Sequence, residues 1–386
     1  MDGTPGLKPL VILGATGSIG TQALEVASRL GWPVAAIAGR TCSDRLFDLA
    51  AAHPAAAIAV ADPDEAGRAR YLDHLGDRVS FGPDALAALA THPGSIVVNG
   101  VVGAAGLAPT IAALEAGNRV ALANKESLVV GGPLVVAAAE HGGGEVIPVD
   151  SEHSALWQCL VGEPAGAVRR LILTASGGPF RGRTAAAIAG VTVAEALAHP
   201  TWTMGPRITI DSATLMNKAF EVIEAHYLYR VAYDDIDVVV HPQSIVHSLV
   251  EFADGSVKAQ LGEPDMRLPI QYAITYPERV AVPGDGLDLT TTSLAFETPD
   301  REAFPCLGLG YRAGKEGGSA PAVLNAADEV AVAAFLDGRI AFPAIAAVVE
   351  ATLDAVPSRP VTTVADALEV DAKARVEAAR LVASHE

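Results

Sequence analysis

The sequence of 386 residues contains few cysteines, few lysines, few aromatic residues and no long apolar run. Its three cysteines, Cys42, Cys159 and Cys306, are odd in number and far apart, which argues against a disulfide framework and favours a reducing compartment. No apolar run approaches the roughly 18 residues of a membrane-spanning segment, and no signal or transit segment is recognisable before Leu10. We therefore expect a cytoplasmic protein with buried cysteines.

Positive charge is also scarce. Lys and Arg number 27 against 45 Asp and Glu, which gives a net charge of −18. A surface of this sign repels nucleic acid and anionic membranes, so we expect neither as a partner. A phosphorylated small molecule requires local positive charge, and two of the few lysines, Lys125 and Lys218, lie within motifs described below.

Short apolar segments do recur through the first 150 residues, each closed by glycine or polar residues and separated from the next by helical sequence. Alternation of this kind predicts βαβ units, a parallel sheet and the α/β class. The expected strands lie in "PLVILG", "PVAAIAGR", "AAIAVAD", "SIVVNG", "RVALANKES" and "GEVIPVDSEH".

The rest of the chain has a different pattern. "RRLILTASGGPF", "RITIDS", "DIDVVVHPQSIVHSLVEF" and "SVKAQLGE" read as strands broken by irregular segments, which predicts an α+β domain. Residues 281–300 are rich in Gly, Pro, Thr and Asp and read as a linker. Helical spacing from Ala320 onward predicts a small C-terminal helical domain. We expect domains at 1–149, 150–280 and 301–386.

Gly14, Gly17 and Gly20 form a G-x-x-G-x-x-G turn between the first expected strand and the first helix. Such a turn lets the backbone approach a pyrophosphate at a helix N-terminus, as in Rossmann-like domains, although an ordinary glycine-rich turn has the same pattern. Arg40 ends the second strand, where an acid would bind the ribose of NAD and an arginine accommodates the 2′-phosphate of NADP. The motif therefore favours NADP, unless Arg40 is a solvated surface residue.

Asp150 and Glu152 follow the strand in "GEVIPVDSEH". Alternate residues of an extended segment face the same side, so the two carboxylates are expected to converge. Converging carboxylates raise each other's pKa unless a cation neutralises them, and hard oxygen ligands suit Mg²⁺ or Mn²⁺. An exposed acidic turn is the competing interpretation.

Residues 211–225, "DSATLMNKAFEVIEA", predict a capped helix in which Asn217, Lys218 and Glu221 share one face. Ser212, Asn217 and Lys218 suit a phosphate, and Glu221 suits a metal, although a routine surface pair has the same spacing. Ser176 stands beside two glycines in "TASGGPFR", a natural backbone nest for an anion.

The segment "HPTWTMG" (199–205) combines a histidine, a proline and large apolar residues without periodicity. These features are typical of a lid that excludes water. A packed loop around a hydrogen-bonded His199 is the alternative.

Together, "GATGSIG", "ANKESLV", "PVDSEHSA", "TASGGPFR", "HPTWTMG" and "IDSATLMNKAFEVIEAH" occur in an order that resembles the 1-deoxy-D-xylulose-5-phosphate reductoisomerase family. The resemblance runs from about Leu10 to Arg279. It implies NADPH- and divalent-metal-dependent rearrangement of the substrate, by retro-aldol/aldol steps or an α-ketol shift, followed by hydride transfer to give 2-C-methyl-D-erythritol 4-phosphate for isoprenoid synthesis. A simple NADP-dependent dehydrogenase of the homoserine or semialdehyde type is the alternative.

The resemblance also implies roles for individual residues. The metal ligands would be Asp150, Glu152 and Glu221, and Trp202 would cover the substrate. Residues at the reacting groups would be Lys125, Glu152, His199 and Glu221. The substrate contacts would be Lys125, Ser151, Glu152, Ser176, His199, Ser212, Asn217, Lys218 and Glu221. The NADPH contacts would be Thr16, Gly17, Ser18, Ile19, Gly39, Arg40, Thr41, Asn124, Glu126 and Gly205.

The resemblance further implies a homodimer, to which Ile236–Leu261 is expected to contribute. Three departures from the family pattern stand out. Pro206 precedes Arg207 where two basic residues are common, Thr41 replaces a common asparagine, and "NKAFE" replaces "NKGLE". We expect Pro206 to stiffen the lid and Thr41 to alter the 2′-phosphate contact in detail.

Overall fold

The computed structural model describes residues 7–283 and 286–385. The chain forms two compact units. The first unit comprises residues 1–127, 134–154 and 265–283, and the second comprises 128–133, 155–264 and 284–386. In the described ranges, no helix has both the length and the apolar character needed to cross a membrane.

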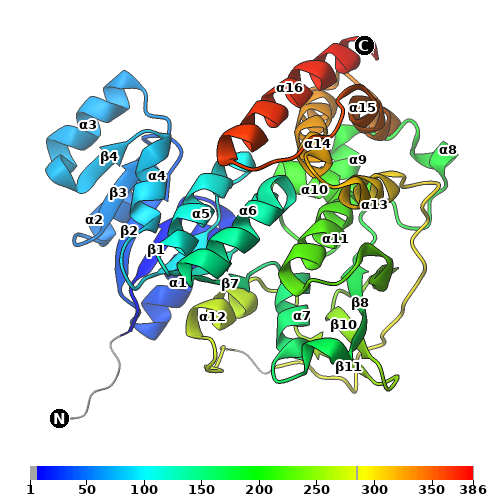
Figure 1. Ribbon diagram of the computed structural model, residues 1–386, viewed down its shortest axis with the longest axis horizontal. Coiled ribbons are helices and arrows are strands. Elements are labelled where there is room, and N and C mark those ends of the chain that lie inside the picture. The colour runs from blue at the N-terminus through cyan, green and yellow to red at the C-terminus, as the bar shows by residue number, and fades with distance from the viewer. Residues whose placement is uncertain (1–6, 284–285, 386) are drawn as a thin grey trace. The chain divides into compact units, whose positions relative to one another are not determined.

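A seven-stranded, fully parallel sheet forms the centre of the first unit (Figure 1). The strands lie in the order β4-β3-β2-β1-β5-β6-β7, so the order reverses between β1 and β5. Parallel strands point their carboxyl ends to one edge, and ligands of such sheets bind outside that edge near the reversal. The strands are β1 (Leu10–Leu13), β2 (Val34–Gly39), β3 (Ala57–Val60), β4 (Val79–Phe81), β5 (Ile96–Asn99), β6 (Arg119–Leu122) and β7 (Glu145–Pro148).

Helices connect these strands. The helix α12, which comes from much later in the chain, packs against α1, while α4 packs against α5. Coverage by helices explains why the central strands β1 and β5 are buried along their whole length, with apolar residues throughout β1 and at the first three positions of β5. The helices of this unit are α1 (Ser18–Leu30), α2 (Asp44–Ala52), α3 (Glu65–Leu75), α4 (Pro83–Ala90), α5 (Leu107–Glu115), α6 (Glu126–Gly142) and α12 (Arg267–Thr275); residues 128–133 of α6 group with the second unit.

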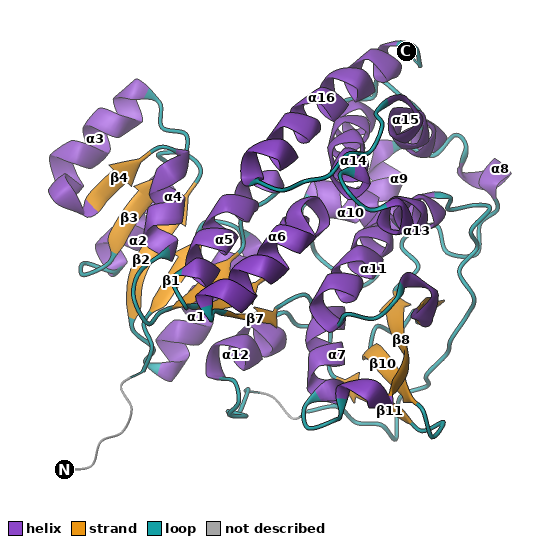
Figure 2. Cartoon of the chain, viewed as in Figure 1, coloured by secondary structure: helices purple, strands orange, loops and turns teal. Residues whose placement is uncertain are grey.

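The second unit is built on a four-stranded mixed sheet in the order β11-β10-β8-β9 (Figure 2). The strands β8 and β9 are parallel, and β10 runs antiparallel to β8 and β11. The helix α11 packs against β8 and β9. The strands are β8 (Val168–Ala175), β9 (Ile236–Val240), β10 (Val246–Phe252) and β11 (Val257–Leu261).

The remaining helices of the second unit include a C-terminal group in which α14 packs against α13, α15 and α16. The helix α14 also contacts α10. The helices are α7 (Ser151–Leu160), which begins in the first unit, α8 (Ala185–Ile188), α9 (Val193–Leu197), α10 (Pro206–Thr214), α11 (Met216–Tyr229), α13 (Cys306–Glu316), α14 (Ala320–Leu336), α15 (Phe342–Ala355) and α16 (Val364–Ala383).

The α/β class, the parallel first sheet and a second part that contains both helices and strands are confirmed, but one short strand was missed and one predicted strand is a helix. The strand β4 was not predicted, because three residues are too few to show a period. The segment "RITIDS" was predicted as a strand and instead lies in α10. Its β-branched residues favour strand, but Gly205 caps the helix, Pro206 occupies its first turn, and packing against α11 and α14 outweighs the local preference.

Candidate active site

The glycine loop joins β1 to α1 at the carboxyl edge of the parallel sheet. Gly14 has φ of 80°, and a Cβ there would approach the carbonyl oxygen of Gly100 to 2.6 Å. A Cβ on Gly20 would lie 2.3 Å from the carbonyl oxygen of Gly14. Gly17 is the N-cap of α1, a helix of 13 residues. The turn is therefore as tight as the sequence predicts, and it presents a helix N-terminus suited to an anion.

The second strand ends beside this loop, because β2 pairs with β1. Gly39 closes β2, and a Cβ there would meet the side chain of Leu46 at 2.9 Å. The side chain of Arg40 is 85% exposed, and its Nε lies 3.9 Å from Oδ2 of Asp62. An exposed guanidinium at this edge is accessible to a phosphate, and the carboxylate of Asp62 competes with the phosphate for it.

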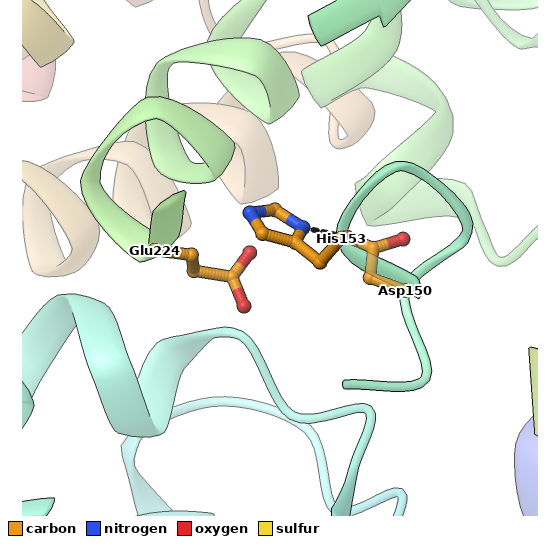
Figure 3. Close-up of side chains that lie close together, drawn as sticks. All are labelled: Asp150, His153 and Glu224. Carbon is orange, nitrogen blue, oxygen red and sulfur yellow. Dashed lines mark ion pairs between the residues drawn. The ribbon is translucent and has the colours of Figure 1, made fainter. Parts of the chain in front are cut away.

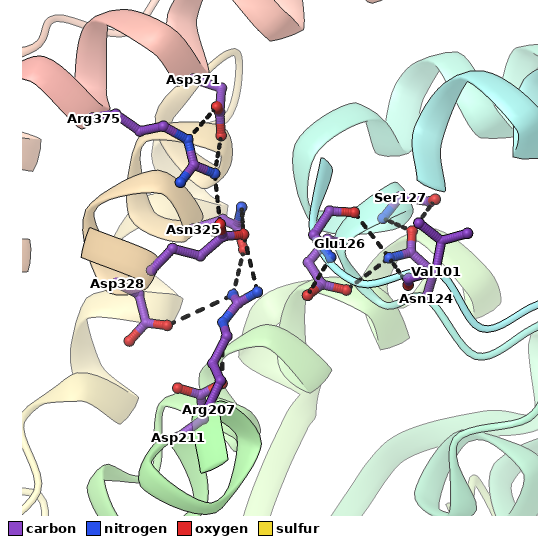
Figure 4. Close-up of polar contacts among 12 residues, drawn as sticks. Val101, Asn124, Glu126, Ser127, Arg207, Asp211, Asn325, Asp328, Asp371 and Arg375 are labelled. Carbon is purple, nitrogen blue, oxygen red and sulfur yellow. Dashed lines mark hydrogen bonds and ion pairs between the residues drawn. The ribbon is translucent and has the colours of Figure 1, made fainter. Parts of the chain in front are cut away.

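Asn124 and Glu126 connect the ends of β5 and β6 (Figure 4). The amide of Asn124 donates to the carbonyls of Val101 and Gly103 at 2.8 and 3.0 Å, and to Glu126 at 2.9 Å. The other carboxylate oxygen of Glu126 accepts from the backbone N–H of Gly103 at 3.1 Å. These two predicted cofactor residues therefore hold the loop after β5 in place.

Lys125 lies between them and reaches across to the end of β7. Its Nζ donates to Oδ2 of Asp150 at 2.8 Å, and both side chains are mostly buried. The hydroxyl of Ser151 donates to Oε2 of Glu152 at 2.5 Å. The imidazole of His153, which is fully buried, lies beside Asp150 with 3.9 Å between Nδ1 and Oδ2 (Figure 3). The backbone N–H of Ser151 donates to Oδ1 of Asp150 at 3.1 Å, so Lys125, Asp150, Ser151 and Glu152 form one hydrogen-bonded group.

The extended conformation predicted for the segment that contains Asp150 and Glu152 is wrong. The sequence predicted an extended segment with alternating side chains, but α7 begins at Ser151 and Glu152 lies in its first turn. The acids are also not an exposed turn, since the side chain of Asp150 is 18% exposed. A carboxylate in the first turn of a helix interacts favourably with the helix dipole, and Glu152 has this position in α7.

In the second unit, His199 brings two predicted phosphate residues together. Its Nε2 lies 3.1 Å from Oγ of Ser176 and 3.2 Å from Oγ of Ser212. Its Nδ1 accepts from the backbone N–H groups of Thr201 and Trp202, at 3.2 and 2.9 Å. Since Nδ1 is an acceptor, the neutral ring carries its proton on Nε2, where it faces the two hydroxyls. Burial lowers the pKa of His199 from its ordinary value, which favours this neutral form.

The junction of α10 and α11 carries the other expected phosphate residues. Residues 211–225 were predicted as one capped helix, but Leu215 separates the two helices with φ of 60° and ψ of 15°. A left-handed conformation disfavours a residue with a Cβ, and strain of this kind persists only where the surroundings enforce it. The break creates a second helix N-terminus at Met216, and the first turn of α11 contains Asn217 and Lys218.

Glu221 is fully buried one turn into α11. Nδ2 of Asn217 donates to one carboxylate oxygen at 2.6 Å, and Nζ of Lys218 donates to the other. Lys218 is itself only 5% exposed, so these residues are not the routine surface pair that the spacing also allowed. The carboxylate of Glu221 is thus held in a fixed position, and its oxygens are of the type that a hard divalent cation prefers.

Three family models match consecutive parts of the chain. One, described as 1-deoxy-D-xylulose 5-phosphate reductoisomerase, matches residues 10–132. Two C-terminal domain models of the same enzyme match residues 146–229 and 261–377. Curated relatives named 1-deoxy-D-xylulose 5-phosphate reductoisomerase are 51% identical in Xanthomonas oryzae pv. oryzae, over 98% of both chains, and 53% identical in Symbiobacterium thermophilum, over 90% of this chain and 92% of that one.

The chain belongs to the 1-deoxy-D-xylulose 5-phosphate reductoisomerase family.

Solved structures of 1-deoxy-D-xylulose 5-phosphate reductoisomerases agree with this placement. The enzyme of Zymomonas mobilis, in complex with NADPH, has a TM-score of 0.90 and 41% identity, covering 98% of this chain and all of that one. A second, in complex with NADPH, fosmidomycin and magnesium, has a TM-score of 0.91 and 38% identity, covering 98% of both chains.

The reaction of a 1-deoxy-D-xylulose 5-phosphate reductoisomerase therefore applies here: an NADPH- and divalent-metal-dependent rearrangement and reduction that yields 2-C-methyl-D-erythritol 4-phosphate. The simple dehydrogenase alternative is not favoured, because the relatives match over nearly the full length. The resemblance identified from the ordered motifs is confirmed.

Sequence reasoning gave no role to two buried residues near the predicted ligands of this reductoisomerase. His153 follows Asp150 by three residues, and Glu224, which is 3% exposed, follows Glu221 by three on α11. The i,i+3 spacing was visible in the sequence, but the burial that distinguishes these residues from a solvated helix face was not.

Proposed function

We propose that the first unit binds NADPH along the carboxyl edge of its parallel sheet, in a Rossmann-like manner. The glycine loop and the N-terminus of α1 suit the pyrophosphate, and Arg40 suits the 2′-phosphate. The enzyme of Zymomonas mobilis, which has the same fold, binds NADPH. The contacts are assigned to Thr16, Gly17, Ser18, Ile19, Gly39, Arg40, Thr41, Asn124 and Glu126, with Gly205 contributed by the second unit.

We further propose that Asp150, Glu152 and Glu221 bind one divalent cation. Together they are a set of three carboxylates able to hold a metal ion, and their all-oxygen chemistry suits Mg²⁺ or Mn²⁺. Burial with two donors makes Glu221 a preformed ligand. When bound, the ion supplies Lewis-acid polarisation of the substrate's ketone and neighbouring hydroxyl. We assign Lys125 and Ser151 to positions beside the reacting carbons; the hydrogen bond that each forms with one of the proposed ligands supports this assignment.

The substrate phosphate is assigned to the second unit. The hydroxyls of Ser176 and Ser212 converge on Nε2–H of His199, and all three groups can donate to phosphate oxygens. This convergence is the observation that carries the assignment, because it joins residues from three separate motifs. Asn217 and Lys218 complete the pocket at the N-terminus of α11, where the helix dipole favours an anion.

The lid is proposed to be residues 199–205, which contain no helix or strand. The ring of Trp202 lies 6.5 Å from that of His247, and its backbone N–H is held by His199. Closing this segment excludes water from hydride transfer, for which NADPH supplies the chemistry and the protein supplies placement.

NADPH oxidation in the presence of 1-deoxy-D-xylulose 5-phosphate, with and without Mg²⁺, tests the proposal as a whole. We expect turnover that requires both the sugar phosphate and the metal, and none with a semialdehyde, the substrate that a dehydrogenase of the homoserine type would reduce with NADPH. Oxidation of NADPH without a metal ion would contradict the proposed metal site of three carboxylates.

We also propose that the protein is a homodimer to which Ile236–Leu261 contributes. The strand β11 is the edge of its sheet, and its residues 257–259 are exposed. An edge strand presents unpaired backbone groups that another copy can bind. Sedimentation at micromolar concentration should show a dimer, and a single monomeric species would contradict it.

We propose the domain organisation that the sequence predicts: a cofactor domain over 1–149, a catalytic and dimerisation domain over 150–280, a linker over 281–300 and a helical domain over 301–386.

We also propose that the protein is cytoplasmic, as the sequence predicts. The three cysteines are free, and Cys159 and Cys306 are buried, while Cys42 is only partly so. Free thiols are compatible with the reducing cytoplasm.

A further inference from the structure

Arg207 lies in the first turn of α10, two residues after the lid ends at Gly205. Its guanidinium is held by two residues of α14 (Figure 4). Nη1 donates to Oε1 of Glu329 at 2.9 Å, and Nη2 donates to Oδ1 of Asn325 at 3.0 Å. Asn325 also donates to the same oxygen of Glu329 at 3.2 Å, so the acceptors are fixed relative to one another.

The contact continues from α14 to α16. The second oxygen of Glu329 accepts from Nη2 of Arg375 at 2.7 Å. Arg375 in turn forms a two-pronged contact with Asp371, at 2.6 and 3.1 Å. Glu329 is thus shared between two arginines, and a chain of charges runs from α10 through α14 to α16.

This chain is largely shielded from water. The side chain of Arg207 is 22% exposed and that of Glu329 18%, while Asn325 is fully buried. Asp211 and Asp328, which are almost fully buried, each place a carboxylate oxygen 3.8 Å from the guanidinium. Exposed ion pairs contribute little, whereas removing one partner from a buried pair leaves an uncompensated charge. Arg207 is therefore a strong constraint on where α10 begins.

The position of α10 matters because Ser212 lies on the same helix. Five residues separate Arg207 from Ser212, which is about 7.5 Å of helix rise. The carbonyl of Gly205 accepts from both the backbone N–H and the hydroxyl of Thr209, at 3.1 and 2.8 Å, so the end of the lid is tied to the first turn. A displacement of this turn would move the Ser212 hydroxyl away from His199.

We propose that Arg207 is a positioning residue for phosphate recognition, held by Asn325 and Glu329. The hydrogen bonds of its guanidinium described above go to Asn325 and Glu329, which are not among the reacting groups assigned above. Its guanidinium fixes α10 against α14, and α10 in turn fixes the Ser212–His199 contact and the end of the lid. This inference rests on the proposed function, because it concerns the same phosphate pocket. It gives the C-terminal helices a part in substrate binding.

Steady-state kinetics of the full-length enzyme test the inference with Arg207→Met and Glu329→Gln. A misplacement of about 1 Å can reduce efficiency about a hundredfold. We expect each variant to raise KM for the sugar phosphate about tenfold or more, to leave kcat within a few-fold, and to leave the Kd of NADPH unchanged. Arg207→Lys keeps the charge but loses the two-pronged geometry, so it should restore KM only in part.

Two reference variants separate the outcomes. Arg312→Met removes an exposed pair between α13 and α15, with Asp354, and should leave KM unchanged. Ser212→Ala reports on the pocket itself. A raised KM for Ser212→Ala beside an unchanged KM for folded Arg207→Met overturns the positioning role alone. An unchanged KM for Ser212→Ala overturns the pocket assignment and the inference with it. If Arg207→Met does not fold, an unchanged KM for Glu329→Gln is the contradicting result.

Discussion

Lys218 and Glu221 form an ion pair one turn apart on α11, and the carboxylate of Glu221 is fully buried. The ammonium of Lys218 can therefore interact with two anions. One is the buried carboxylate of Glu221, and the other is the substrate phosphate assigned to the start of the helix. A carboxylate that can be neutralised by either an ammonium or a metal ion links phosphate binding to metal binding through one side chain. The first prediction follows from this link.

Lys218→Ala should weaken binding of the phosphorylated substrate. Loss of one charged hydrogen bond typically costs about 1.5–3 kcal/mol, so KM should rise roughly ten- to a hundredfold. The variant should also bind Mg²⁺ at least as tightly as the unaltered enzyme, because Glu221 loses its competing cation. An unchanged KM would show that Lys218 serves only to neutralise Glu221.

Arg40 and Asp62 should have opposite effects on cofactor choice. Arg40→Asp should weaken NADPH binding and reduce the enzyme's preference for NADPH over NADH. Asp62→Asn removes the carboxylate 3.9 Å from the guanidinium and should tighten NADPH without affecting NADH. The comparison of kcat/KM for both cofactors measures each effect. Equal turnover with both cofactors in the unaltered enzyme would refute this role of Arg40.

His199 should titrate differently when its pocket is filled. Burial lowers the pKa of the free imidazole, so its contribution to stability is present above the ordinary value near 6.5 and is lost as pH falls through the lowered pKa. A bound dianion favours the protonated ring and should raise the pKa again. NMR of the ring nitrogens with and without inorganic phosphate measures the change. A pKa that phosphate does not move would place His199 outside the pocket.

The free energy of unfolding should decrease as pH rises because of the buried carboxyl of Asp328. Its carboxyl is fully buried near Asp211, and desolvation, followed by repulsion from Asp211 and Glu329, raises its pKa against the opposing effect of Arg207. The stabilisation is complete below the unfolded value near 4 and is lost as pH rises through the raised pKa. Asp328→Asn should therefore flatten the dependence of the free energy of unfolding on pH above about 4. Parallel urea-denaturation profiles of both proteins would contradict this.

The elements that sequence predicts well are those whose pattern is local. The apolar runs of β1, β2, β5 and β6 and the glycine turn after β1 follow from strand burial and from turns that exclude a Cβ. The strand predicted at residues 207–212 failed because packing, which is not local, decided between helix and strand.

The site shows the same division. The residue types at positions 150, 152 and 221 indicate a metal without any structure, but the helix that begins at Ser151 and the break at Leu215 depend on the surroundings. The contact of Arg207 with Asn325 and Glu329 joins residues more than a hundred positions apart. No pattern along a single sequence reports a pairing at that distance.

The most direct test of the account is metal dependence in Glu221→Gln, which keeps the size and hydrogen-bonding capacity of the side chain but removes its charge. Rates titrated with Mg²⁺ should show much weaker metal binding and a nearly abolished reaction. Fluorescence titration of the same variant should show unaltered NADPH binding, since most of the assigned contacts lie in the other compact unit. Normal activity at low Mg²⁺ would contradict the claim that Glu221 shares a cation with Asp150 and Glu152.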